Sequence, residues 1–221
     1  MNIGITCYPT FGGSGVVATE LGIELAKKGH IVHFISYGLP FKLNKFYKNI
    51  FFHEVEMLHY PLFKYPPYSL SLSAKMAEVI ESGNLDILHV HYAMPHAASA
   101  YLAKKIIGIK KNIFVTTLHG TDITLVGNQQ SFYRITKFSI EQSDGITCVS
   151  NYLKETTAKI FKIDKEMEVI YNFVDTEKYK RTDKNRRNVD FVDKDDKVAM
   201  HISNFRPIKK IDNIIKVFNA L

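Results

Sequence analysis

The first residues with recognisable chemistry are the glycines of FGGSG, residues 11–15, which follow an apolar run over residues 2–7. A glycine-rich loop between a strand and a helix exposes backbone N–H groups at the helix N-terminus, where an anion is favoured. Gly13, Gly15 and Ala18 also satisfy the G-x-G-x-x-A pattern of dinucleotide-binding proteins. The alternative is a tight turn in which the glycines serve only helix–strand packing.

The residues after the loop argue against two common nucleotide-binding motifs. A dinucleotide site needs an acidic residue about 20 positions further on, and no Asp or Glu occurs between Glu24 and Glu54. A P-loop needs Gly-Lys-Ser/Thr after the glycines, and this sequence has none there.

Polar or titratable residues follow the other predicted strands as well. HYAMPHA begins at His91, HGTD begins at His119, and Ser150 and Asn151 follow a further apolar run. Ligands of open parallel sheets bind outside the carboxyl ends of the strands. We therefore expect these residues to line one site together with the glycine loop.

His89, His91 and His96 raise the question of zinc, because imidazole is a good zinc ligand. The first two are only same-face neighbours on a strand, and no carboxylate or cysteine completes a ligand set, so we expect no metal and no cofactor. Cys7 and Cys148 have no recognisable pairing and are expected to be buried in a reducing cytoplasm.

Strand-length apolar runs alternate with helical patterns through the first 172 residues, which predicts βαβ units and an α/β fold with a parallel sheet. The expected strands cover about 2–8, 31–37, 50–58, 85–91, 113–120, 145–150 and 167–172. The expected helices cover about 16–29, 69–82, 96–108, 132–143 and 151–161.

The domain organisation is expected to change near residue 173. Residues 1–172 are predicted to form a complete Rossmann-like domain, 173–197 a polar linker, and 198–221 the start of a second domain with a strand over 198–205 and a helix after it. A lone strand and helix cannot bury their apolar faces, so the sequence is expected to be a fragment of a longer protein.

The formal charge of +7 raises the question of nucleic-acid binding, but the lysines are scattered and no nucleic-acid motif is present. Anionic small molecules are the expected partners, and nucleic acid is not. A signal peptide and an apolar run of about 18 residues are both missing, so we expect a cytoplasmic protein without stable membrane anchoring. The sequence leaves homo-oligomerisation open.

Several motifs together resemble those of a known family. GITCYPTFGGSGVVATELG, HYAMPHA and LHGTDIT are the most specific, and EQSD, VIYNFVD and SNFRPIKK also match. With them the chain resembles the retaining GT-B glycosyltransferases of family 4. The resemblance implies an acceptor-binding first domain and a nucleotide-sugar-binding second domain. It also implies transfer of N-acetylglucosamine from UDP-GlcNAc to the hydroxyl of L-malate, the first step of bacillithiol biosynthesis.

The resemblance assigns roles to individual residues on the donor side. The Gly13 amide is expected to approach the donor diphosphate, Ser14 to help hold the acceptor, and His119 to lie beside the donor sugar. Without a metal, cationic side chains must stabilise the leaving UDP. The matching residues are Arg206 and Lys209, with Lys210 as an alternative because this loop is shorter than in many relatives.

On the acceptor side, L-malate is a dianion and needs paired hydrogen-bond donors. The candidates are Tyr92, Thr117, Thr121, Arg134 and Asn151. Two alternatives stay open: a family-4 transferase with another acceptor, such as an inositol phosphate or a lipid-linked sugar, and an inactive anion-binding fragment. The family's Glu-x7-Glu pair has no counterpart in these 221 residues, so the activity of this chain alone also stays open.

Overall fold

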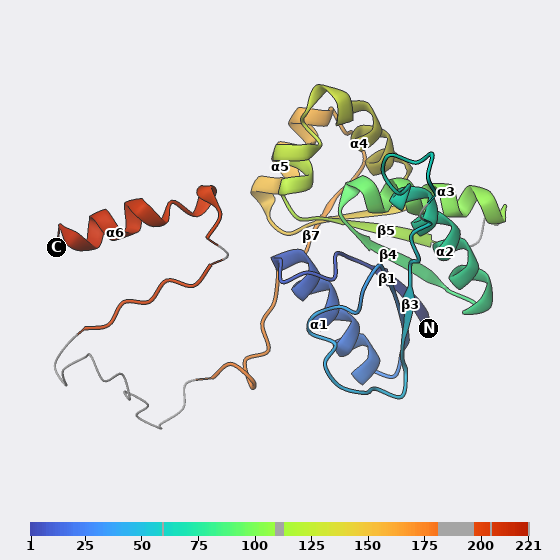
Figure 1. Cartoon of the computed structure of the whole chain (residues 1–221), viewed down its shortest axis with the longest axis horizontal. Helices are drawn as coiled ribbons and strands as arrows, with labels where there is room; N and C mark the ends of the chain where they lie inside the picture. The colour runs from blue at the N-terminus through green and yellow to red at the C-terminus, as the bar shows by residue number, and fades with distance from the viewer. Residues whose placement is uncertain (59, 109–112, 181–196, 204, 221) are drawn as a thin grey trace. The chain divides into compact units, whose positions relative to one another are not determined.

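The computed structural model describes residues 1–58, 60–108, 113–180, 197–203 and 205–220. The chain forms two units, Met1–Val174 and Asp175–Leu221, and each is described by itself (Figure 1). Most of the predicted linker, residues 181–196, lies outside the described residues.

Unit 1 is built on a parallel sheet of seven strands in the order β3-β2-β1-β4-β5-β6-β7 (Figure 1). The strands are β1 (Asn2–Thr6), β2 (Ile31–Ser36), β3 (Ile50–Glu54), β4 (Ile87–His91), β5 (Ile113–Leu118), β6 (Gly145–Cys148) and β7 (Glu168–Val169). This confirms the predicted α/β fold with a parallel sheet. The strand order changes direction between β1 and β4, and open sheets of this kind form a crevice at the carboxyl ends of such a pair.

Helices cover both faces of the sheet. They are α1 (Gly13–Lys27), α2 (Tyr68–Ser82), α3 (Ala98–Ile107), α4 (Gln130–Gln142) and α5 (Asn151–Phe161), with π-helical turns η1 (Ala93–Ala97) and η2 (Asp122–Val126). Helix α1 lies on one face and α2 to α5 on the other (Figure 1), as right-handed crossovers require for this strand order. Among the described residues, no helix combines the length and apolar character needed to cross a membrane.

The alternation of side chains along β4 separates an apolar layer from a polar one. Leu88 and Val90 belong to the same buried cluster as Leu72 and Met76 of α2. Because successive side chains of a strand point to opposite faces, His89 and His91 lie on the face that carries α1. The sheet thus holds the histidines on one side while its other side packs against helices.

Two glycines of α1 are required by close packing. A Cβ on Gly15 would lie 2.3 Å from the carbonyl oxygen of Tyr8 and 2.9 Å from that of Thr10. A Cβ on Gly22 would lie 2.4 Å from Cζ of Phe34 in β2. Gly13 differs, because among the described residues, its chain neighbours and its own helix backbone aside, nothing lies within 4 Å of the position that its Cβ would take. The packing explanation of the glycine loop therefore holds for Gly15 but not for Gly13.

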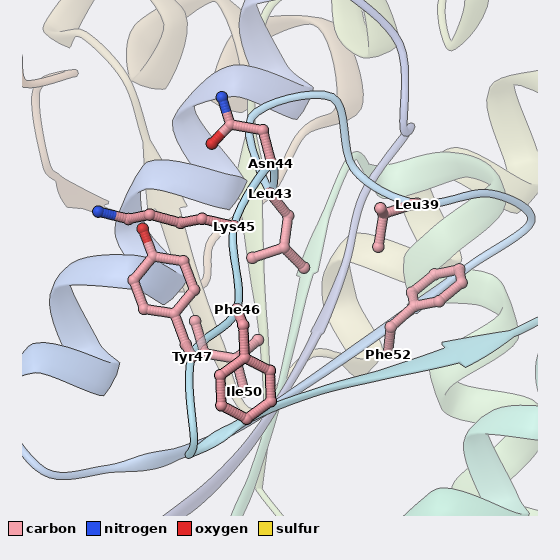
Figure 2. A pocket seen from close by; sticks show the side chains of 8 residues that line it. All are labelled: Leu39, Leu43, Asn44, Lys45, Phe46, Tyr47, Ile50 and Phe52. Atoms are coloured by element: carbon pink, nitrogen blue, oxygen red, sulfur yellow. The ribbon is translucent and has the colours of Figure 1, made fainter.

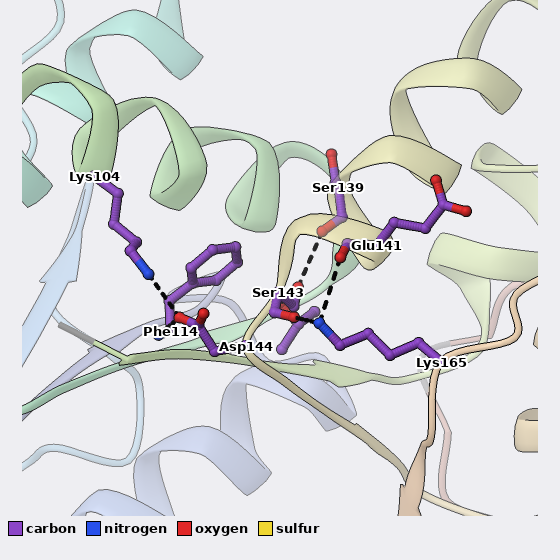
Figure 3. A network of polar contacts seen from close by, with 8 residues as sticks. Lys104, Phe114, Ser139, Glu141, Ser143, Asp144 and Lys165 are labelled. Carbon is purple, nitrogen blue, oxygen red and sulfur yellow. Dashed lines mark hydrogen bonds and ion pairs between the residues drawn. The ribbon is translucent and has the colours of Figure 1, made fainter. Parts of the chain in front are cut away.

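A polar network connects the amino ends of β5 and β6 (Figure 3). The polar loops lie at the other, carboxyl ends of the strands. Oδ2 of Asp144 accepts hydrogen bonds from Lys104 Nζ at 2.7 Å and from Phe114 N at 2.8 Å. Lys165 donates to the carbonyl oxygen of Ser143. This network fixes α3 and α4 to the sheet and is separate from the carboxyl ends of the strands.

A cavity of about 390 Å³ opens between the segment 39–47 and β3 (Figure 2). Its wall is mostly apolar, and Leu43, Tyr47 and Phe52 belong to it, with Asn44 and Lys45 as polar members. It lies at the β3 edge and shares no lining residue with the loops that follow β1, β4, β5 and β6.

Unit 2 contains the short helix η3 (Pro207–Lys209) and the helix α6 (Ile211–Asn219). The predicted helix after residue 205 is confirmed. The predicted strand over 198–205 is wrong for its described residues, which form no strand. A strand needs a neighbour that pairs with its backbone N–H and C=O groups, and the described residues of unit 2 provide none.

We expect Gly15→Ala and Gly13→Ala to differ in stability. The methyl group at residue 15 must displace backbone atoms of Tyr8 and Thr10, which should lower the free energy of unfolding by about 1–3 kcal/mol. The methyl group at residue 13 enters open space, so its effect should stay within about 0.5 kcal/mol. Urea unfolding followed by circular dichroism measures both values. Equal losses would show that the loop does not pack as described.

Candidate functional site

The glycine loop places the N-terminus of α1 at the carboxyl end of β1. Helix α1 begins at Gly13, and the N-cap residue Gly12 makes no side-chain capping bond. The first N–H groups of a helix have no acceptor within it, so those of Gly13 and Ser14 are suited to an anion. Tyr8 connects this loop to the next one, because its ring lies 5.3 Å from that of Tyr92.

Tyr92 follows β4 directly and is held in an uncommon backbone conformation. Its φ is 92°, in the region that non-glycine residues rarely adopt. Its N–H donates to the carbonyl oxygen of Thr117 at 2.9 Å, and its hydroxyl lies 2.7 Å from Oγ1 of Thr121. Its ring stacks on His119 with centroids 5.7 Å apart. Strained residues of this kind cluster at binding sites.

The carboxylate of Asp122 joins the loops that follow β4 and β5. Its Oδ2 accepts a hydrogen bond from Ala93 N at 3.1 Å, and its Oδ1 accepts from Gly120 N at 2.8 Å and from His119 N at 3.2 Å. The side chain is buried. Burial raises the pKa of this carboxyl, while the three backbone hydrogen bonds oppose that shift. The contacts fix the main chain of His119 relative to the end of β4.

Three imidazole rings form a stack on the α1 face. The ring centroids of His89 and His91 are 4.5 Å apart, and those of His91 and His119 are 5.1 Å apart. Nδ1 of His91 lies 2.8 Å from Nε2 of His119. His96 closes the end of β4 by donating from Nδ1 to the carbonyl oxygen of His91.

These histidines are neutral at pH 7. Burial lowers the pKa of His89, His96 and His119 to about 4. Burial, followed by the neighbouring imidazoles, lowers the pKa of His91 well below its usual value. Within the described part of the chain, no group of three or more His, Cys, Asp or Glu side chains is placed to hold a metal ion.

The six predicted acceptor residues lie on several elements. Ser14 is in the first turn of α1, and Tyr92 and Thr121 lie together beside His119. Thr117 is buried on the sheet, and its Oγ1 lies 2.7 Å from both Nε2 of His89 and Oγ1 of Thr147. The other two are exposed: Asn151 begins α5 and donates from Nδ2 to the Tyr171 hydroxyl at 3.1 Å, and Arg134 lies in α4.

The predicted cationic residues belong to unit 2. Arg206 precedes η3, Lys209 ends it, and the N–H of Lys209 donates to the carbonyl oxygen of Arg206 at 2.8 Å. Lys210 follows with a φ of 49° and begins α6 as its N-cap. All three side chains are exposed within their own unit.

Sequence reasoning placed HYAMPHA and HGTD at the site but assigned no role to Asp122 and did not predict the contact of His91 with His119. Asp122 is part of HGTD, and a carboxylate two residues after a loop glycine commonly accepts local N–H groups, so that signal was available. The contact of His91 with His119 joins residues 28 positions apart, so no local sequence pattern indicates it.

Comparison with known proteins identifies the class. The family model "Glycosyltransferase Family 4" matches residues 11–178, so the chain belongs to glycosyltransferase family 4. Unit 1 has the fold of GT-B glycosyltransferases. It resembles a glycosyltransferase from Rickettsia africae at a TM-score of 0.56 with 25% identity, over 80% of this chain and 44% of that one. It also resembles HepE of Anabaena, solved with UDP-glucose, at a TM-score of 0.61 with 15% identity, over 83% of this chain and 47% of that one.

One curated relative is much closer in sequence. The N-acetyl-alpha-D-glucosaminyl L-malate synthase of Bacillus anthracis is 51% identical over 219 residues, which is 99% of this chain and 57% of the relative. The chain therefore spans little more than half the length of that relative.

We expect the free energy of unfolding to decrease as pH falls from about 7 toward 4. In this window the unfolded chain takes up protons on histidines that stay neutral in the folded protein, so stability rises with pH. Each such histidine contributes a slope of up to about 1.4 kcal/mol per pH unit. Asp122 has the opposite effect because its pKa is raised in the folded protein. Its contribution to the free energy of unfolding is present at low pH and is lost as pH rises through that pKa.

Urea unfolding at a series of pH values measures this slope. His119→Gln should flatten it, and His201→Gln, at an exposed position of unit 2, is the matched control. An unchanged slope in His119→Gln would contradict the expectation that His119 stays neutral in the folded protein.

We expect Asp122→Asn to loosen both loops. The amide keeps one acceptor oxygen and turns an N–H group toward the backbone donors, which should cost about 1.5–3 kcal/mol of unfolding free energy. Hydrogen exchange at the amides of Ala93, His119 and Gly120 should become faster. Asp86→Asn is the control, because that exposed carboxylate accepts a backbone bond from Asn2 at 2.8 Å. Unchanged exchange in Asp122→Asn would show that the carboxylate does not hold the loops.

Proposed function

We propose that unit 1 is the acceptor-binding part of a retaining transferase that moves N-acetylglucosamine from UDP-GlcNAc to the hydroxyl of L-malate in the cytoplasm. The observation that carries this is the 51% identity over 99% of the chain to a protein named as that synthase. The geometry supports it, because polar loops follow β4 and β5 and the N-terminus of α1 follows β1, all at the carboxyl ends of parallel strands.

In this proposal the donor diphosphate lies at the start of α1. The open space that the described residues leave beside Gly13 gives room for a phosphate to approach the backbone. The bond between the anomeric carbon and the diphosphate oxygen breaks, and UDP leaves with the electron pair. Arg206 and Lys209, or Lys210, stabilise that negative charge, so the proposal requires no metal.

The acceptor binds between the loops that follow β4 and β5. The hydroxyl groups of Tyr92 and Thr121, with Ser14 and Asn151, supply hydrogen-bond donors to the carboxylates of malate. Thr117 supports the site from the sheet, and Arg134 is the charged candidate. The malate hydroxyl forms the new bond to the anomeric carbon and passes its proton to the leaving diphosphate oxygen of UDP, while His119 positions a hydroxyl at the reacting centre.

The test is a transfer assay by mass spectrometry, with this chain and with a version extended through a complete second domain. We expect the extended protein to form N-acetylglucosaminyl malate from UDP-GlcNAc. Gly13→Ala in that protein should weaken donor binding because its methyl group takes the space of the phosphate, although it should leave stability almost unchanged.

The same assay separates the acceptors. Inositol phosphate, other hydroxy acids and a lipid-linked sugar each replace malate in turn. Product from one of these and none from malate would overturn the acceptor assignment while leaving the family in place. No product with any acceptor would favour a binding role for the anion site.

A further inference from the structure

We infer that His91 is a positioning residue, which donates a hydrogen bond from its Nδ1 to Nε2 of His119 and thereby leaves His119 with its proton on Nδ1. His119 then offers the substrates an N–H donor and no basic lone pair. This deepens the proposed function and rests on it for the role of His119, whereas the position of the proton follows from unit 1 alone.

The first step is that a single proton forms the hydrogen bond between the rings of His91 and His119. Nδ1 of His91 and Nε2 of His119 are 2.8 Å apart, so one of them donates and the other accepts. Both rings are stacked, and His91 is buried. A second proton on either ring would place a charge inside this stack, which burial opposes. Each ring therefore carries one proton.

The second step places the proton of His91. Its other ring nitrogen, Nε2, is buried and has no hydrogen-bond partner among the described residues. His91 borders a cavity of about 310 Å³ whose wall includes the apolar side chains of Val17 and Leu21. A buried N–H without an acceptor is rare in folded proteins, while an unused acceptor is tolerated better. The proton of His91 therefore belongs on Nδ1, where it has an acceptor.

The third step assigns His119. Because its Nε2 accepts the bond from His91, the proton of this neutral ring is on Nδ1. No described residue makes a hydrogen bond to that nitrogen, and it is not among the buried polar atoms that lack a partner. The ring of His119 is only partly buried and stacks on Tyr92, whose hydroxyl contacts Thr121, so a substrate bound at these loops can reach the Nδ1–H group.

His96 holds His91 in place from the other side. A carbonyl oxygen can only accept, so Nδ1 of His96 carries a proton and donates it to the carbonyl of His91. Asp122 fixes the backbone N–H of His119. Asp122 therefore holds the main chain of His119, and His91 holds its ring.

Nitrogen-15 NMR of the histidine rings tests the proton position without any enzyme assay. Long-range proton–nitrogen correlations distinguish a protonated ring nitrogen from a bare one, and the loss of one pair of signals in His119→Gln assigns His119 among the nine histidines. We expect Nδ1 of His119 to be protonated and its Nε2 to be bare near neutral pH. A proton on Nε2 of His119 would overturn the inference.

Two substitutions of His91 test its effect on His119. His91→Asn keeps an amide N–H near the position of Nδ1 and should preserve the His119 signals. His91→Phe keeps the ring shape without a donor and should shift protonation toward Nε2 of His119. Circular dichroism monitors folding, and if His91→Phe does not fold, the wild-type and His91→Asn spectra decide the matter.

Kinetics of the extended protein add a functional readout. With the imidazole of His119 no longer fixed, kcat of His91→Phe should fall roughly 10²-fold with little change in KM for malate, and His91→Asn should restore most of it. An unchanged kcat together with an unchanged His119 spectrum in His91→Phe would refute the positioning role. A protonated Nδ1 in a protein that does not glycosylate malate would instead refute the proposed function and leave this inference intact.

Discussion

The site depends on the buried carboxylate of Asp122. Its oxygens accept N–H groups from the end of β4 and from the loop after β5, and these segments are joined in sequence only through α3 and β5. Without this acceptor, three backbone N–H groups would be left without a partner in or near the core, which folded proteins avoid. The conformation of Tyr92 and the position of His119 both depend on loops held at this spacing.

The carboxyl ends of β4 and β5 carry many polar side chains but few charged ones. Four neutral imidazoles and several hydroxyl groups provide hydrogen bonds, and the one carboxylate is satisfied by backbone donors. The imidazoles and hydroxyl groups are uncharged, so apart from the Asp122 carboxylate they neither repel nor attract a dianion by Coulomb forces. In the proposed reaction the attraction comes from the N-terminus of α1, from Arg134 and from the cations proposed in unit 2.

The sequence was most informative where structure is local. Helix α5 was predicted at its observed bounds, Asn151–Phe161, and in the structure Ser150 caps it by accepting a bond from Leu153 N. The strand predicted over 198–205 was wrong for its described residues, since pairing depends on a partner that a local pattern does not reveal. His91 was expected at the site and weighed as a zinc ligand, but its bond to His119 was not predicted because it depends on the register of β4 and β5.

The two interpretations of the glycine loop apply to different residues. Gly15 is needed because the carbonyl groups of Tyr8 and Thr10 occupy the space of a side chain, and no ligand is required to explain it. Gly13 has open space around it and a φ that does not demand glycine. Neither packing against the described residues nor backbone conformation accounts for a glycine there, which agrees with the proposal that the donor diphosphate approaches this position. The loop therefore combines one glycine that shapes the fold with one for which binding is the proposed reason.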